Sequence, residues 1–166
     1  MATQTLVSVE EYLHTVFEGS DCEYLDGEIV ERNMGNKSHG HVQGEIFYIF
    51  RQLSAKTGLY AVPEVRHRVS ATRFRIPDVA VFTSEPESEV PDLPPLVAIE
   101  VLSPDDRIGY IVPKLDEYRQ WGVPHIWVAD PEDRKLLVYN ADGLHEVTQL
   151  ELPQYGIVLT KDAIFG

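Results

Sequence analysis

A carboxylate in the middle of an apolar run is the feature that most constrains this chain. The run LVAIEVLS (96–103) has six apolar residues of eight, yet Glu100 lies inside it. The run FRIPDVAVF (74–82) places Asp78 among apolar neighbours in the same way. Burying an unpaired carboxylate costs several kcal/mol, so such groups persist when they are paired, protonated, hydrogen-bonded or bound to a metal. Whatever fold forms must compensate both acids.

The order of predicted elements indicates an α/β fold, with a mixed central sheet flanked by helices on both faces. A capping box at Ser8 predicts a helix to about residue 17, and Asp26-Gly27 predicts a hairpin. Apolar periodicity predicts a second helix, from caps at Asn36 or Ser38 to Gly58. Strands are expected over 59–70, 74–82, 95–103 and 124–131, a third helix over 114–121, and a closing meander with turns at 131–134 and 141–143.

Length and composition indicate one soluble globular domain over residues 1–166. The lone Cys22 excludes a disulfide framework or a cysteine metal cluster and suits a reducing, cytoplasmic setting. No apolar stretch can span a bilayer, and the N-terminus does not resemble a secretory signal, so no membrane partner is expected. The net charge of −13 opposes tight nucleic-acid binding without excluding it, since much of the acid lies in a few segments, one of which is the loop 83–95.

Asp78 and Glu100 are 22 positions apart on successive predicted strands, and they would lie side by side if those strands are neighbours. Two close carboxylates raise each other's pKa, and a divalent cation relieves the repulsion. Oxygen ligands of this kind suit Mg2+ or Mn2+. The structural alternative is that Pro77 marks a strand start or an edge where Asp78 is solvated, while Glu100 either faces outward at a strand end or pairs with Arg73 or Arg75.

Lys114 is the third candidate, because it follows Glu100 by 14 positions at the expected start of the next helix. Pro113 would be tolerated there, since the first helical turn lacks internal N–H partners. Tyr118 lies four residues further on and shares the face of Lys114. An isolated helical lysine is usually a solvated charge, so the role of Lys114 depends on the two acids.

In combination these segments resemble the Uma-two family of restriction endonucleases, which has the PD-(D/E)XK, restriction-endonuclease-like fold. The resemblance covers nearly the whole chain, through short motifs in a fixed order. The matching segments are EYLDGEIVE (23–31), SHGHVQGEI (38–46), IPDVAVF (76–82), VAIEVLSPDDR (97–107) and KLDEYRQWGVPHIWVADP (114–131).

The resemblance implies that Asp78 and Glu100 are metal ligands and that Lys114 is the catalytic lysine. The usual lysine position falls on Leu102, so the lysine has moved to the following helix. His39 matches a family histidine, with a structural hydrogen bond as its alternative role. Two departures, Tyr110 and Pro113, flank Lys114 and affect its orientation. Glu45 and Tyr118 are further candidates as accessory groups, although Glu45 suits the surface equally. The candidates for contacts with nucleic acid are Arg66, Arg68, Arg73 and Arg75. The alternative is that these arginines only balance the acidic loop.

The functional hypothesis is a Mg2+- or Mn2+-dependent endonuclease that hydrolyses phosphodiester bonds of nucleic acid, with DNA as the first candidate. Asp78, Glu100 and the carbonyl oxygen of Val101 would hold the metal, and a homodimer would suit cleavage of both strands of a duplex. The alternative is a non-catalytic dimeric interaction or scaffold module with a vestigial nuclease cleft. A carbohydrate-active hydrolase would also use paired acids but gives Lys114 no role. No helix-turn-helix, zinc finger or aromatic stacking motif narrows the substrate.

Overall fold

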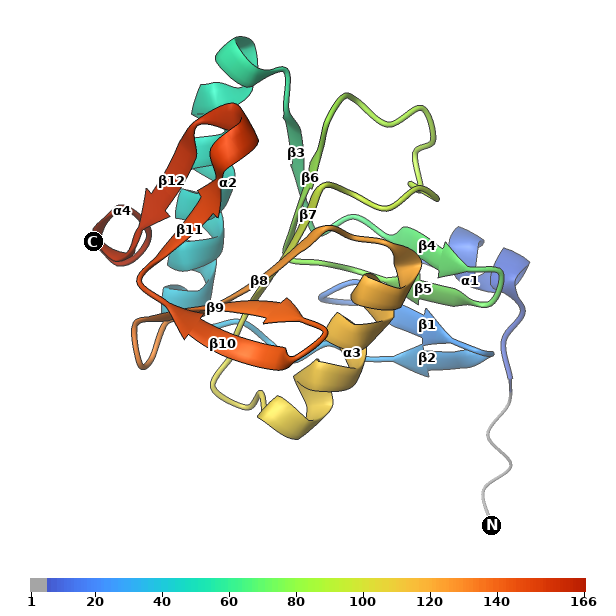
Figure 1. The fold of residues 1–166 in the computed structure, drawn as a ribbon. Helices are drawn as coiled ribbons and strands as arrows, with labels where there is room; N and C mark the ends of the chain where they lie inside the picture. Colours follow the sequence, from blue (N-terminus) through green and yellow to red (C-terminus); the bar gives the residue numbers. More distant parts are fainter. Residues whose placement is uncertain (1–5) are drawn as a thin grey trace.

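The computed structural model describes residues 6–166 and is built on a six-stranded mixed sheet, in the order β10-β9-β8-β7-β6-β3 (Figure 1). The neighbours β7 and β8 are parallel, and the other pairs are antiparallel. This mixed sheet confirms the predicted fold class. The strands are β3 (Tyr60–Pro63), β6 (Val79–Phe82), β7 (Val97–Val101), β8 (His125–Asp130), β9 (Lys135–Asn140) and β10 (Gly143–Val147).

Two helices, α2 (Lys37–Thr57) and α3 (Ile108–Trp121), cover opposite faces of this sheet (Figure 1). The predicted caps of α2 are confirmed: the Asn36 side chain accepts a hydrogen bond from the His39 N–H at 2.9 Å, and Gly58 ends the helix with a φ of 75°. Phe50 of α2 stacks on Trp127 of β8 within the larger core. A second apolar cluster lies under α3. The central strands β6, β7 and β8 are therefore buried on both faces of the sheet.

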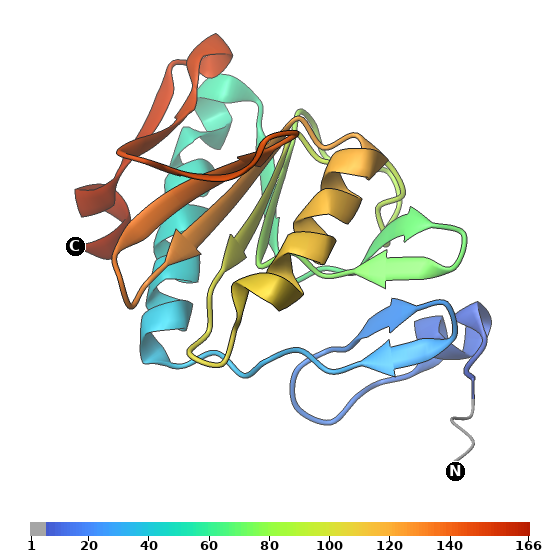
Figure 2. The same cartoon turned by 60° about the horizontal axis from the view of Figure 1, so that its bottom comes forward.

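A second sheet, in the order β2-β1-β5-β4, carries the N-terminal hairpin on the α3 side of the molecule (Figure 2). Asp26-Gly27 joins its first two strands as predicted. Tyr12, Tyr24 and Phe74 form a small aromatic core beneath it. The strands of this sheet are β1 (Glu23–Leu25), β2 (Glu28–Val30), β4 (His67–Ser70) and β5 (Arg73–Arg75), and the short helix α1 (Val9–His14) precedes them in the chain.

Two predicted strands are each divided between the two sheets. Residues 59–70 form β3 and β4, with Glu64 at a φ of 50° between them. Residues 74–82 form β5 and β6, which are separated by Ile76-Pro77-Asp78. Proline has no N–H to donate to a ladder, so the break at Pro77 is consistent with its chemistry. Asp78 therefore lies at the point where the chain leaves one sheet and enters the other.

The predicted helix bounds are wrong at two places. The first helix ends at His14 and not near residue 17. The helix α3 begins at Ile108, so Pro113 lies inside it and Lys114 is not in its first turn. The sequence carries no signal for this start because Arg107, at the N-cap, makes no side-chain capping hydrogen bond.

The chain closes with β11 (Gln149–Leu152), the short 3-10 turn η1 (Pro153–Tyr155), β12 (Ile157–Thr160) and α4 (Lys161–Phe165). The antiparallel pair β11–β12 forms a separate ribbon, and α4 packs beside α2 (Figure 1). Leu150, Leu159 and Ile164 from this segment belong to the larger core. Among the helices within residues 6–166, none has both the length and the apolar character that a membrane crossing needs.

Candidate active site

A cavity of about 510 Å³ lies between the N-terminal hairpin, the sheet and the first turns of α3. Asp78, Glu100 and Lys114 all line it, although they come from the break before β6, from β7 and from α3. The two acids are brought together because β6 and β7 are antiparallel neighbours, with Val79 opposite Ile99. The structure thus unites the three residues that the sequence singled out.

Asp78 is buried, with an exposed fraction of 3%, and each carboxylate oxygen has a donor. Arg32 Nη2 donates to Oδ1 at 2.8 Å, and the Val101 N–H donates to Oδ2 at 2.7 Å. His39 Nε2 lies 3.5 Å from Oδ2. The alternative in which Asp78 is simply solvated at a strand edge is therefore wrong. Its orientation is fixed by β7, by the segment after β2 and by the start of α2.

Glu100 is also buried and is held by α3. Tyr118 donates its hydroxyl hydrogen to Glu100 Oε1 at 2.7 Å, and Lys114 Nζ lies 2.9 Å from the same oxygen. Pairing of Glu100 with Arg73 or Arg75 is wrong, because its cation is Lys114. Lys114 and Tyr118 do share one helical face, and that face points onto the sheet.

Glu23 of β1 is a member of the site that the sequence analysis missed. Its Oε1 accepts from the Ile76 N–H at 2.9 Å and lies 2.8 Å from Lys114 Nζ, and its Oε2 accepts from Arg75 Nη1 at 2.8 Å. Glu23 stands between Cys22 and Tyr24 in a short, buried strand. The rule that identified Glu100, an acid among apolar strand residues, would have found it.

The four arginines expected to contact nucleic acid lie in different surroundings. Arg66 donates two hydrogen bonds to Asp21, both at 2.6 Å, and stacks over the Tyr12 ring. Arg73 and Arg75 both donate to Glu117 of α3. These three are engaged by acids outside the loop 83–95, so balancing that loop is not their role. Arg68 is exposed on β4.

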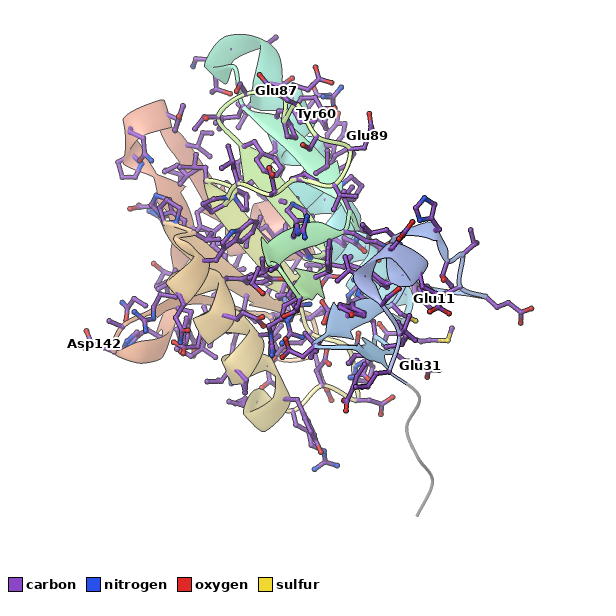
Figure 3. All side chains as sticks on the ribbon, turned by 90° about the vertical axis from the view of Figure 1, so that its right-hand side faces the viewer. Glu11, Glu31, Tyr60, Glu87, Glu89 and Asp142 are labelled. Carbon is purple, nitrogen blue, oxygen red and sulfur yellow. The ribbon has the colours of Figure 1, made fainter. Side chains whose placement is uncertain are left out.

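The other accessory candidates differ in their distance from the cavity. His39 lines it, whereas Glu45 is half-buried further along α2 and does not. Arg32, which the sequence analysis did not single out, lines the cavity and pairs with Asp78. Figure 3 shows Glu31, another lining residue, near the hairpin and far from Glu87 and Glu89 of the acidic loop. This acidic loop is therefore remote from the site.

Burial and neighbouring charges shift the pKa values of the three carboxylates in different directions. Burial, together with the charges of Asp78 and Glu23, raises the pKa of Glu100 to about 7 against the lowering effect of Lys114. Burial acts to raise the pKa of Glu23 as well, but Lys114 and Arg75 lower it to about 2. Burial also acts to raise the pKa of Asp78, but its neighbours, chiefly His39, Lys114 and Arg32, lower that pKa below its ordinary value. Carboxylates with separated pKa values in one cavity are typical of functional sites.

The donors in this cavity fit a hard divalent cation of the Mg2+ type. Within residues 6–166, no group of three or more His, Cys, Asp or Glu side chains is placed to hold a metal ion by itself. Mg2+ does not need such a cage, since it commonly binds through one or two carboxylates and keeps water or substrate oxygens as its other ligands. Asp78 and Glu100 supply two carboxylates at one cavity. The site therefore has the donor chemistry for Mg2+ or Mn2+ bound in this partial way.

We expect Gly35→Ala to displace the His39 ring from Asp78. A Cβ at residue 35 would lie 2.6 Å from His39 Nδ1, closer than real Cβ contacts allow. The interaction with Asp78 raises the pKa of His39, so the variant should show a lower His39 pKa in an NMR titration of metal-free protein. Gly40→Ala is the matched control, because a Cβ at that helical position meets nothing within 4 Å. An unchanged His39 pKa in Gly35→Ala would contradict the predicted displacement.

Comparisons with known proteins agree with this architecture. A crystal structure of "a putative nuclease belonging to DUF820" from Anabaena variabilis ATCC 29413 is similar, with a TM-score of 0.81 and 19% sequence identity. The match covers 96% of this chain and 97% of that one. No curated protein matches the chain. The family Uma2, described as "Putative restriction endonuclease", matches residues 9–164. The chain belongs to the Uma2 family, whose restriction-endonuclease-like fold arranges the two sheets and the helices around this cavity.

Proposed function

We propose that this protein is a metal-dependent endonuclease that hydrolyses phosphodiester bonds of nucleic acid, and that DNA is the preferred candidate for its substrate. The observation that carries the proposal is the convergence of Asp78, Glu100 and Lys114 on one cavity from three separate elements. The family description and the nuclease with the similar fold support the same activity. The proposal includes the PD-(D/E)XK assignment, with its lysine relocated to α3.

Each residue has a chemical role in this proposal. Mg2+ or Mn2+ held by Asp78, Glu100 and the carbonyl oxygen of Val101 would polarise a phosphate oxygen and lower the pKa of a bound water. Lys114 positions that water and stabilises the charge that develops at phosphorus. Arg32 and the Val101 N–H fix the orientation of Asp78, and Tyr118 fixes that of Glu100. The protein thus contributes preorganised charges at a buried point.

Three further parts of the proposal concern assembly, location and substrate contacts. A homodimer would place two cavities for cleavage of both strands of a duplex. A cytoplasmic location agrees with the single, free and buried Cys22. Among the four arginines first considered, Arg68 is the exposed one that lacks an ion pair with any described acid, so it is the best placed to touch a phosphate. Arg66, Arg73 and Arg75 would have to exchange partners to do so.

The alternative function is a non-catalytic interaction or scaffold module. One observation favours it: the buried acids have protein cations beside them, with Arg32 at Asp78, Lys114 at Glu100 and Arg75 at Glu23. Such a cluster can persist without a metal ion, as in a vestigial cleft. The two functions therefore differ in whether a divalent cation binds and whether cleavage depends on it.

Calorimetric titration with Mn2+, beside a cleavage assay, separates the two functions. The wild-type protein should bind Mn2+, and Glu100→Gln should lose that binding because it removes one of two carboxylate ligands. Glu151→Gln removes the same charge from an exposed residue of β11, and this variant should bind Mn2+ as the wild type does. Cleavage of linear and circular DNA, and of RNA, should require Mg2+ or Mn2+ and stop in EDTA. Absence of both heat and cleavage would favour the scaffold module and overturn the nuclease.

A further inference from the structure

The rim of the cavity carries an exposed aromatic ring that the core does not use. Tyr110, in the first turn of α3, is 79% exposed and lines the cavity that holds Asp78, Glu100 and Lys114. The buried side of α3 is formed by Ile111, Leu115 and Tyr118 instead. A single exposed tyrosine needs no explanation. A large flat ring beside the candidate catalytic groups is a surface on which part of a substrate can lie.

The backbone beside Tyr110 is open to a ligand. Gly109 also lines the cavity, and a Cβ there would meet nothing within 4 Å, so a ligand can approach its N–H closely. The 14-residue helix α3 begins here without a side-chain cap from Arg107, and a helix N-terminus attracts anions such as phosphate. Arg107 itself is exposed and forms no salt bridge with the described acids. Ring, open backbone and free cation lie within four consecutive residues.

The charges of the cavity argue against recognition through phosphates alone. Its lining includes six carboxylate residues (Glu23, Glu31, Asp78, Glu100, Asp105 and Asp106) and three Lys or Arg residues (Arg32, Arg75 and Lys114). Each of these three cations already has an acid partner. Binding that tracks a duplex backbone requires free positive charge, which is scarce here. Stacking on an aromatic ring supplies affinity that does not depend on that charge.

We propose that Tyr110 stacks on an unpaired base of the substrate. This inference rests on the proposed nuclease function and specifies its substrate class. The faces of bases inside a duplex are covered by their neighbours, so a base reaches this ring only when it is single-stranded, at an end, or turned out of the stack. The substrate is therefore nucleic acid with an unpaired segment next to the scissile bond.

A second copy of the chain is the competing occupant of this rim. Ile108 and Met34 are 65% and 79% exposed on the two segments that border the cavity, and these segments are joined by a hydrogen bond from Asn33 to Asp106 at 2.6 Å. Exposed apolar groups of this kind also occur in dimer interfaces. The position of Tyr110 beside the buried acids favours the nucleotide, because a dimer contact has no need of them. The oligomeric state is measured as part of the test.

The test compares two Tyr110 variants with a matched tyrosine elsewhere. Fluorescence anisotropy, in EDTA to prevent cleavage, measures binding of a labelled single-stranded DNA and of its blunt duplex. Tyr110→Ala should weaken binding of the single strand by about tenfold, the usual effect of losing one stacking side chain. Tyr110→Phe keeps the ring and should bind as the wild type does. Tyr48→Ala, on α2 and 57% exposed outside the cavity, should also leave binding unchanged.

The other outcomes separate this inference from the function on which it rests. If the wild type cleaves DNA but Tyr110→Ala binds the single strand as tightly as Tyr48→Ala does, the stacking role is wrong and the nuclease stands. If Tyr110→Ala loses affinity equally for the single strand and for the blunt duplex, the inference that the substrate has an unpaired segment is wrong. If Tyr110→Ala converts a dimer to a monomer in sedimentation velocity, the ring belongs to a subunit interface. A wild type that neither binds nor cleaves any nucleic acid would overturn the proposed function itself.

Discussion

Asp78→Asn is expected to reduce metal-dependent cleavage of nucleic acid by at least about 100-fold, the scale on which loss of a preorganised charged group lowers enzymatic rates. The change keeps the size of the side chain but removes its charge. It also replaces one of the two acceptor oxygens with an NH2 group, so the side chain can keep only one of its two hydrogen bonds, which Arg32 donates to Oδ1 and the Val101 N–H donates to Oδ2. The variant therefore loses the negative charge that attracts a cation and one of the two hydrogen bonds that orient the side chain.

Asp105→Asn is the matched control for this effect. Asp105 lines the same cavity but is exposed at its rim, so its substitution removes one charge without touching the buried cluster. Initial cleavage rates at saturating Mg2+, and again at saturating Mn2+, would be measured for both variants, with circular dichroism to show that each is folded. Asp78→Asn cleaving at the rate of Asp105→Asn would place the chemistry outside this cavity.

Asp78 and Glu100 were predictable because burial in an apolar strand imposes the same cost on any carboxylate, whatever the fold. That cost can be recognised from local sequence, and it pointed to both residues without knowledge of their partners. The partners themselves are set by tertiary structure. Arg32 reaches Asp78 across 46 positions, and Arg75 reaches Glu23 across 52. The spacing of such residues along the sequence does not indicate that they are in contact. The sequence analysis therefore missed Arg32 and Glu117.

The division of the strands is a second feature that local sequence could not define. Continuous apolar runs predict strands but do not say which sheet a strand joins, and β5 and β6 belong to different sheets although three residues separate them. The start of α3 was missed because its N-cap, Arg107, is not a capping residue type. This error concealed the exposed first turn that carries Tyr110. The interpretation of residues 1–166 as one domain stays a prediction.

Lys114→Met is expected to destabilise the metal-free protein by about 3 kcal/mol at neutral pH, within the range for breaking a buried ion pair from one side. Lys114 Nζ lies 2.8 Å from Glu23 and 2.9 Å from Glu100. Without the ammonium, Glu23 keeps Arg75, but Glu100 keeps only the hydrogen bond from Tyr118. The main cost therefore falls on Glu100. Urea unfolding of the variant and the wild type measures it.

The dependence of this loss on pH has a definite sign. Burial already raises the pKa of Glu100 to about 7 in the wild type, and loss of Lys114 raises it further, whereas the unfolded chain has the ordinary value near 4.5. The folded variant then binds more protons than the unfolded chain between these values, so its stability falls as the pH rises through them. Below about pH 4.5 both states are protonated and the contribution of Glu100 disappears. The difference between variant and wild type should therefore be larger at pH 8 than at pH 5.

A second substitution separates the structural role of this ion pair from its chemical role. In Lys114→Met/Glu100→Gln the buried charge is gone and Tyr118 can still donate to the amide oxygen, so most of the lost stability should return while cleavage stays absent. Lys135→Met is the control for removing an ammonium, because Lys135 pairs with Asp133 at the exposed turn before β9 and its loss should change stability little. If Lys114→Met costs no more than Lys135→Met, the ammonium is not what compensates Glu100. Recovery of stability without recovery of cleavage would show that the cluster keeps its charges for chemistry, since the neutral pair holds the fold equally well.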